Sequence, residues 1–143
     1  MGLGLFAAWL GEAGRRAKPA SWISLMLIST LLIGATGCNS SEARRAEDIT
    51  HGNADRGEKD IERYGCGGCH RIPGISGADG LIGPSLERIA SRAYIAGRQI
   101  NKPDVMIAWI RDPSHLRAPT AMPNLGVTDQ EARDIAAYLY TLK

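Results

Sequence analysis

Cys66-Gly67-Gly68-Cys69-His70 is the stretch of this 143-residue chain that decides its fold. Two thiols three residues apart, followed at once by a histidine, are typical of covalent haem attachment. Each thiol can add across one vinyl group of a porphyrin, and the adjoining imidazole then lies where it can bind the iron from one face. We therefore predict one covalently bound haem c, attached at Cys66 and Cys69, with His70 as an iron ligand.

The same motif is compatible with chemistry that does not involve haem. A zinc site would need two further Cys or His ligands at zinc spacing, and no second pair follows. A thioredoxin-like redox pair belongs at a strand-to-helix turn, whereas strand patterns are scarce here. A disulfide between Cys66 and Cys69 would leave His70 without a role. A chance match remains a further alternative for any five-residue pattern.

Residues 1–37 have the pattern of an export leader. Three basic residues precede an uncharged run, as in the first part of a secretory signal. The almost continuously apolar part, 22–33, is shorter than the roughly 20 residues that a membrane span needs. Small residues directly precede Cys38, which resembles a bacterial lipoprotein signal, although Ala35 stands where that motif usually has leucine.

The leader predicts an exported protein on the periplasmic side of a bacterial membrane, lipid-anchored through Cys38. An ordinary signal peptide and an uncleaved anchor are the alternatives. From Cys38 onward the chain has 14 Lys or Arg and 14 Asp or Glu, so the mature chain has no net formal charge. Nucleic-acid binding is not indicated, because there is no basic stripe. Residues 38–53 are polar with few large apolar side chains, which predicts a flexible tether.

Residues 54–143 are expected to form one all-α domain, because no alternating strand pattern of useful length occurs. The first helix is predicted over 54–64, with Gly57 as a place where another helix crosses closely. Gly65 is a suitable C-terminal stop for this helix.

Three further helices are predicted in the second half of the domain. Ser85 can cap a short helix whose apolar side runs from Leu86 to Ala93. Pro103 fits the first turn of the next helix. Thr128-Asp129-Gln130-Glu131 is a capping box, and it opens the last helix.

These motifs, taken in order, resemble class I cytochrome c. The resemblance rests on the haem motif, on Gly83-Pro84-Ser85-Leu86, and on a methionine before a C-terminal Ala-Tyr-Leu helix, and it covers 55–143. It implies three to five helices around one covalent haem, with the first and last helices crossed. It also implies that His70 is the proximal ligand, that Met122 is the distal ligand, and that the carbonyl of Pro84 accepts a hydrogen bond from the proximal imidazole.

Met122 has two rivals in the exported part of the chain. Met106 lies three residues before Trp109 on a helical face, where a place in the apolar core is expected. His115 follows Pro113-Ser114 and is expected at the surface. Met122 lies in a proline-flanked loop, which can hold a thioether toward iron. Trp109 is expected in the haem crevice, with a purely structural role as the alternative.

A haem with both axial positions filled has no open site for a substrate, and methionine raises the reduction potential. The predicted function is therefore one-electron transfer in a respiratory or related chain, without enzymatic activity. A quinol-oxidising complex is the expected kind of donor and a terminal oxidase the expected kind of acceptor. The alternatives are a subunit of a membrane respiratory complex and a haem enzyme or gas sensor with a labile sixth ligand.

Overall fold

The computed structural model describes residues 37–143, so the predicted export leader lies outside the described residues except for its last position. Helices dominate this part of the chain, as predicted, and the all-α class is confirmed. The α-helices are α2 (Gly37–Thr50), α3 (Ala54–Arg63), α4 (Pro103–Arg111), α5 (Pro113–Leu116) and α6 (Asp129–Thr141). Two 3-10 turns, η2 (Cys66–Gly68) and η3 (Ile89–Ser91), and two strands, β1 (Tyr94–Ile95) and β2 (Gln99–Ile100), complete it.

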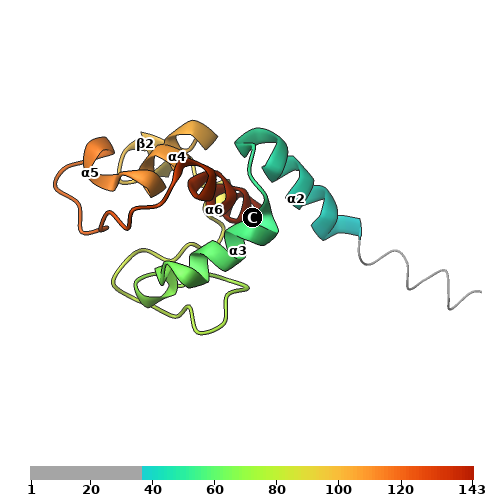
Figure 1. Cartoon of the computed structure of the whole chain (residues 1–143), viewed down its shortest axis with the longest axis horizontal. Coiled ribbons are helices and arrows are strands. Elements are labelled where there is room, and N and C mark those ends of the chain that lie inside the picture. The colour runs from blue at the N-terminus through green and yellow to red at the C-terminus, as the bar shows by residue number, and fades with distance from the viewer. Residues whose placement is uncertain (1–36) are drawn as a thin grey trace, which may run out of the picture. The chain divides into compact units, whose positions relative to one another are not determined.

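Helices α3 and α6 cross in close contact (Figure 1). Gly57 lies at the crossing, and a Cβ atom built there would be 1.9 Å from the backbone oxygen of Asp134. Only glycine leaves room for such an approach, so the predicted close crossing at Gly57 is confirmed. Ile61 and Ile135, with exposed fractions of 1% and 3%, are buried on these two helices and belong to the same apolar core.

The ends of the two crossed helices are fixed by local hydrogen bonds. The side chain of Asn53 caps α3 by accepting a hydrogen bond from the backbone N–H of Arg56 at 2.9 Å. At α6, the predicted capping box of Thr128 and Glu131 is present. Gly65 follows α3 with φ of 67°, a left-handed conformation that glycine adopts without a steric penalty. The chain therefore turns sharply just before the haem motif.

The main difference from the sequence prediction concerns residues 38–53, which were expected to form a flexible tether. The first thirteen of these residues belong to α2, which packs against α6 (Figure 1). Ala46 and Thr50 are 2% and 0% exposed, so small side chains provide this contact. A composition argument that counts only large apolar residues does not detect a face of this kind.

The segment after Ser85 also differs from its prediction. Instead of a helix, the chain forms only the single turn η3, preceded by Arg88 with φ of 53°, and then the hairpin of β1 and β2. Ser85 accepts a hydrogen bond from the backbone N–H of Glu87 at 3.2 Å, which forms a tight turn in place of a helix cap. The prediction of a helix here was wrong.

None of the helices within residues 37–143 is long and apolar enough to cross a membrane. The core of this part is formed by aliphatic side chains from the helices and from the loop after the haem motif. It includes Ile61, Ile72, Ile89, Ile95, Met106, Ile107, Ile110, Val127, Ala132, Ile135, Ala136 and Leu139.

Candidate functional site

The two motif cysteines lie on one tight turn at the end of α3. Within this turn, the backbone N–H groups of Cys69 and His70 both donate to the carbonyl of Cys66, at 3.2 and 3.0 Å. Both thiols are free and half-buried, so the structure does not contain a disulfide between Cys66 and Cys69. Burial raises the pKa of the Cys66 thiol, which keeps it protonated at neutral pH. The turn thus presents two thiols and an imidazole together.

The imidazole of His70 is oriented by the loop that follows it. Its Nδ1 atom lies 2.7 Å from the carbonyl oxygen of Pro84. Because a carbonyl only accepts, Nδ1 carries the proton and Nε2 keeps its lone pair for a metal. Gly83 leaves the space for the ring, since a Cβ atom there would be 2.4 Å from Cε1 of His70.

Backbone pairing holds this loop in place. The backbone N–H of Gly83 donates to the carbonyl of Cys69 at 2.8 Å, and the N–H of Leu86 donates to the carbonyl of Arg71 at 2.8 Å. Nη2 of Arg92 donates to the carbonyls of Ser85 and Glu87, at 2.5 and 2.8 Å. The segment that carries Pro84 is therefore tied down on both sides.

The two candidate methionines have different surroundings. Met106 is 3% exposed and belongs to the core on α4, as expected for a packing residue. Met122 is only partly buried in the loop between α5 and α6, and its backbone N–H donates to Oγ1 of Thr120 at 3.2 Å. His115 is exposed on α5. Trp109 is half-buried on α4.

The structure thus joins some of the predicted site residues by direct contacts. Cys66, Cys69, His70 and Pro84 form one connected group. Met122 comes from a separate loop and makes no hydrogen bond to that group within residues 37–143. Of Cys38 the structure describes only the backbone, as part of α2.

Two exposed apolar side chains next to this group were not predicted. Leu81 and Ile82 are 88% and 80% exposed, directly before Gly83. Such a pair at the surface indicates contact with another apolar body. The sequence signal was available, because these are two adjacent large aliphatic residues in an otherwise glycine-rich loop.

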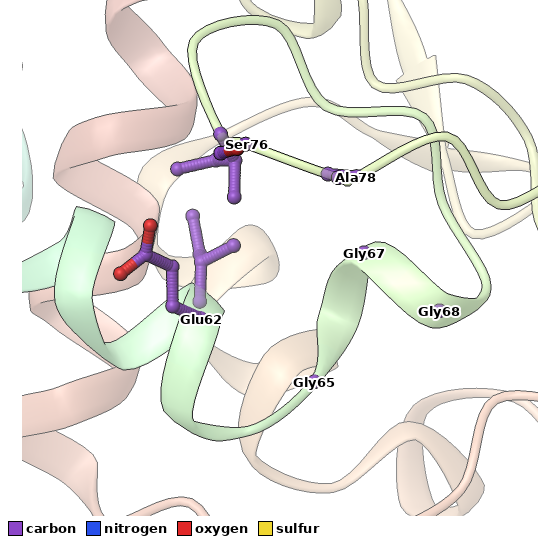
Figure 2. A pocket seen from close by; sticks show the side chains of 9 residues that line it. Glu62, Gly65, Gly67, Gly68, Ser76 and Ala78 are labelled. Atoms are coloured by element: carbon purple, nitrogen blue, oxygen red, sulfur yellow. The ribbon is translucent and has the colours of Figure 1, made fainter.

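A hollow of about 300 Å³ lies beside the motif, between the end of α3 and residues 75–78 (Figure 2). Gly65, Gly67 and Gly68 form one side of it and Ser76 and Ala78 the other, with Glu62 at its edge. His70 and Met122, the predicted iron ligands, do not line this hollow, although Gly67 and Gly68 belong to the haem motif.

A family model for cytochrome c matches residues 54–143. The chain belongs to the cytochrome c family. This cytochrome is also 33% identical over 98 residues to a protein named cytochrome c oxidase subunit 2 from Alkalihalophilus pseudofirmus. The match covers 68% of this chain but only 28% of that relative, so the cytochrome spans about a quarter of the relative's length. No solved structure matches the chain with comparable significance.

Membership of this family means that the cytochrome is an electron-transfer protein with a covalently bound haem c and its iron. The residues at the site fit that group. The two free thiols suit the two vinyl groups, and Nε2 of His70 is available to the iron. The exposed pair Leu81 and Ile82 suits the apolar face of the porphyrin ring. Among the residues whose side chains the structure describes, 41–143, no three or more His, Cys, Asp or Glu side chains are placed to hold a metal ion together.

Proposed function

We propose that this cytochrome carries one electron at a time through a single haem whose iron is bound by His70 and Met122. The observation that carries the proposal is the orientation of His70 by Pro84 at 2.7 Å, directly beside two free thiols. In a member of the cytochrome c family, this arrangement supports covalent attachment at Cys66 and Cys69.

When bound, the haem supplies the change between Fe(III) and Fe(II). The chain's own residues have the other tasks. Cys66 and Cys69 would hold the porphyrin by thioether bonds, which form when a thiol adds across a vinyl group without loss of atoms. The carbonyl of Pro84 holds the proton on Nδ1 of His70, which fixes the ring and raises its basicity toward the metal. Met122 would bind the iron as the second ligand from the protein, so that no coordination position is left for a substrate.

The assignment of Met122 is tested by substitution with a matched control. Met122→Ala should remove the methionine–iron charge-transfer band near the red end of the visible spectrum and allow carbon monoxide to bind the reduced protein. Met106→Leu, which changes a buried core methionine, should leave both properties unchanged. If Met122→Ala keeps the band, the distal ligand is another residue. If the unmodified reduced protein already binds carbon monoxide readily, the haem enzyme or gas sensor alternative is favoured instead.

We also propose that the mature chain begins at a lipidated Cys38 on the periplasmic side of a bacterial membrane. Support comes from the charged and then apolar leader and from the small residues that precede Cys38. A single acyl chain binds a membrane only marginally, whereas two or more hold a protein stably. Cys38→Ser should release a soluble haem protein. If that variant remains in the membrane fraction, the leader is an uncleaved anchor.

A second candidate is that the cytochrome is a subunit of a membrane respiratory complex. The relative named cytochrome c oxidase subunit 2 favours this candidate, since 28% of its length matches this chain. As a free carrier, the protein would accept electrons from a quinol-oxidising complex and pass them to a terminal oxidase. Purification from mild detergent separates the two. A subunit elutes with stoichiometric partner chains, and a free carrier elutes alone.

A further inference from the structure

Helix α2 lies outside the residues that the family model matches, yet its second half is built into the folded domain. Ala46 is 2% exposed and belongs to the same core cluster as residues of α3, α4 and α6. Thr50 is completely buried, and its Oγ1 donates to the carbonyl of Ala46 at 2.7 Å. A polar side chain satisfied in this way is stable in the interior.

The junction between α2 and α3 is fitted closely to α6. A Cβ atom at Gly52 would be 2.1 Å from the backbone oxygen of Arg133, so α6 passes directly against this turn. The backbone N–H of Gly52 donates to Oγ1 of Thr50 at 3.2 Å. Nη1 of Arg133 donates to the carbonyl of Thr50 at 3.4 Å. These contacts therefore hold the end of α2 in a fixed position against α6.

Side chains from α2 and α6 also hold the start of α3. Oε1 of Glu47 accepts hydrogen bonds from Nδ2 of Asn53 at 2.9 Å and from the backbone N–H of Ala54 at 3.0 Å. The backbone N–H of Asn53 donates to Oδ1 of Asp134 at 2.7 Å. Nearer the start of α2, Glu42 forms an ion pair with Lys143.

We propose that α2 is a rigid arm that keeps the haem domain at a short, fixed distance from its anchored end. The membrane part of this inference rests on the proposed lipidation of Cys38. From Cys38 to Thr50 a helix reaches about 18 Å, whereas the same residues fully extended would reach about 40 Å. A domain on such an arm serves redox partners beside its anchor, because it cannot swing to distant ones.

Amide hydrogen exchange of the haem-loaded, full-length protein in detergent tests the arm. An isolated helix of 14 residues is marginal in water, so protection of its amides reports packing on the domain. We expect the amides of residues 45–50 to exchange at least tenfold more slowly than those of an unstructured chain. Exchange at the unstructured rate in the unmodified protein would overturn the proposal.

Two variants and a control connect the protection to the contacts described. Gly52→Ala should raise exchange over 45–50 at least tenfold while the haem spectrum and the protection of α4 stay unchanged. Glu47→Ala, which removes an acceptor without adding a clash, should act in the same direction more weakly. Arg45→Ala changes an exposed residue of α2 and should have no effect. Equal exchange in all four proteins would contradict the role of these contacts.

A Cys38→Ser variant separates the arm from the anchor. The arm predicts that protection over 45–50 persists in this variant whether or not it leaves the membrane. If the variant stays membrane-bound but remains protected, the lipidation proposal fails and the arm stands. If it becomes soluble and loses protection, the arm is wrong and the anchor stands.

Discussion

Gly57→Ala tests the crossing of α3 and α6, on which the haem domain is built. The new methyl group would lie 1.9 Å from the backbone oxygen of Asp134 and 2.5 Å from its carbonyl carbon, both of which are main-chain atoms that cannot rotate away. The two helices must therefore separate by more than an ångström. Overpacking of this kind costs up to about 3 kcal/mol, and the better helix propensity of alanine returns about 1 kcal/mol.

The expected result is a loss of about 2 kcal/mol in the free energy of unfolding. It can be measured by urea unfolding of the haem-loaded protein, followed by helical circular dichroism. Lys59→Ala, at an exposed position of the same helix, should stay within about 0.5 kcal/mol of the unmodified protein. If Gly57→Ala were as stable as the unmodified protein, the close crossing would be refuted.

Three further predictions concern pH and the imidazole. Hydrogen bonds, first from the hydroxyl of Thr128, lower the pKa of Glu131 from 4.5 to about 2. The resulting stabilisation of the folded protein is present above pH 4.5 and is lost as the pH falls toward 2. Over this pH range, the free energy of unfolding, measured with urea, should fall more steeply in the unmodified protein than in Glu131→Gln. Parallel curves for the two proteins would contradict this. Burial raises the pKa of Tyr140 from 10.0 to about 12. The stabilisation from the neutral phenol is complete below pH 10 and is lost as the pH rises through 12. In the same urea assay, Tyr140→Phe should not show this alkaline fall in the free energy of unfolding. The same alkaline fall in both proteins would contradict the role of Tyr140. Gly83→Ala should displace the imidazole and change the midpoint potential in a redox titration. Lys59→Ala, at an exposed position of α3, should leave the potential unchanged. Equal potentials in the Gly83→Ala variant and the unmodified protein would contradict the contact between Gly83 and His70.

The parts of the structure that the sequence predicted depend on local chemistry. The capping box at Thr128, the helix from Ala54 and the stop at Gly65 each follow from interactions within a few residues. The close crossing at Gly57 was predictable because glycine in a helix interior lowers stability relative to alanine. A glycine at such a position therefore indicates that a neighbouring element needs the space.

The parts that were missed depend on contacts between distant segments. The end of α2 and its junction with α3 are held by Asp134 and Arg133, which lie 81 and 83 residues beyond their partners in the chain. Nothing within α2 shows that these partners exist. The segment after Ser85 has an apolar spacing that suits a helix. It instead forms a turn and a hairpin, held by Asn101, whose Nδ2 donates to the carbonyls of Ile89 and Arg92 at 2.9 Å each.

Leu81 and Ile82 could have been singled out from the sequence as a pair of adjacent large aliphatic residues. Large aliphatic residues rarely occur together in a glycine-rich surface loop unless they contact another apolar body. Their position directly before Gly83 and Pro84 connects them to the imidazole. Their exposure of 88% and 80% is known only from the fold.

The most direct test of the central proposal is an absorption spectrum of the purified mature protein, recorded in the reduced and the oxidised states. A closed haem c with His70 and Met122 as ligands predicts the c-type difference spectrum together with the methionine–iron band near the red end in the oxidised state. It also predicts that the haem stays with the chain after acid–acetone extraction. A c-type spectrum without that band would contradict the methionine ligand, and extraction of the haem would contradict attachment at Cys66 and Cys69.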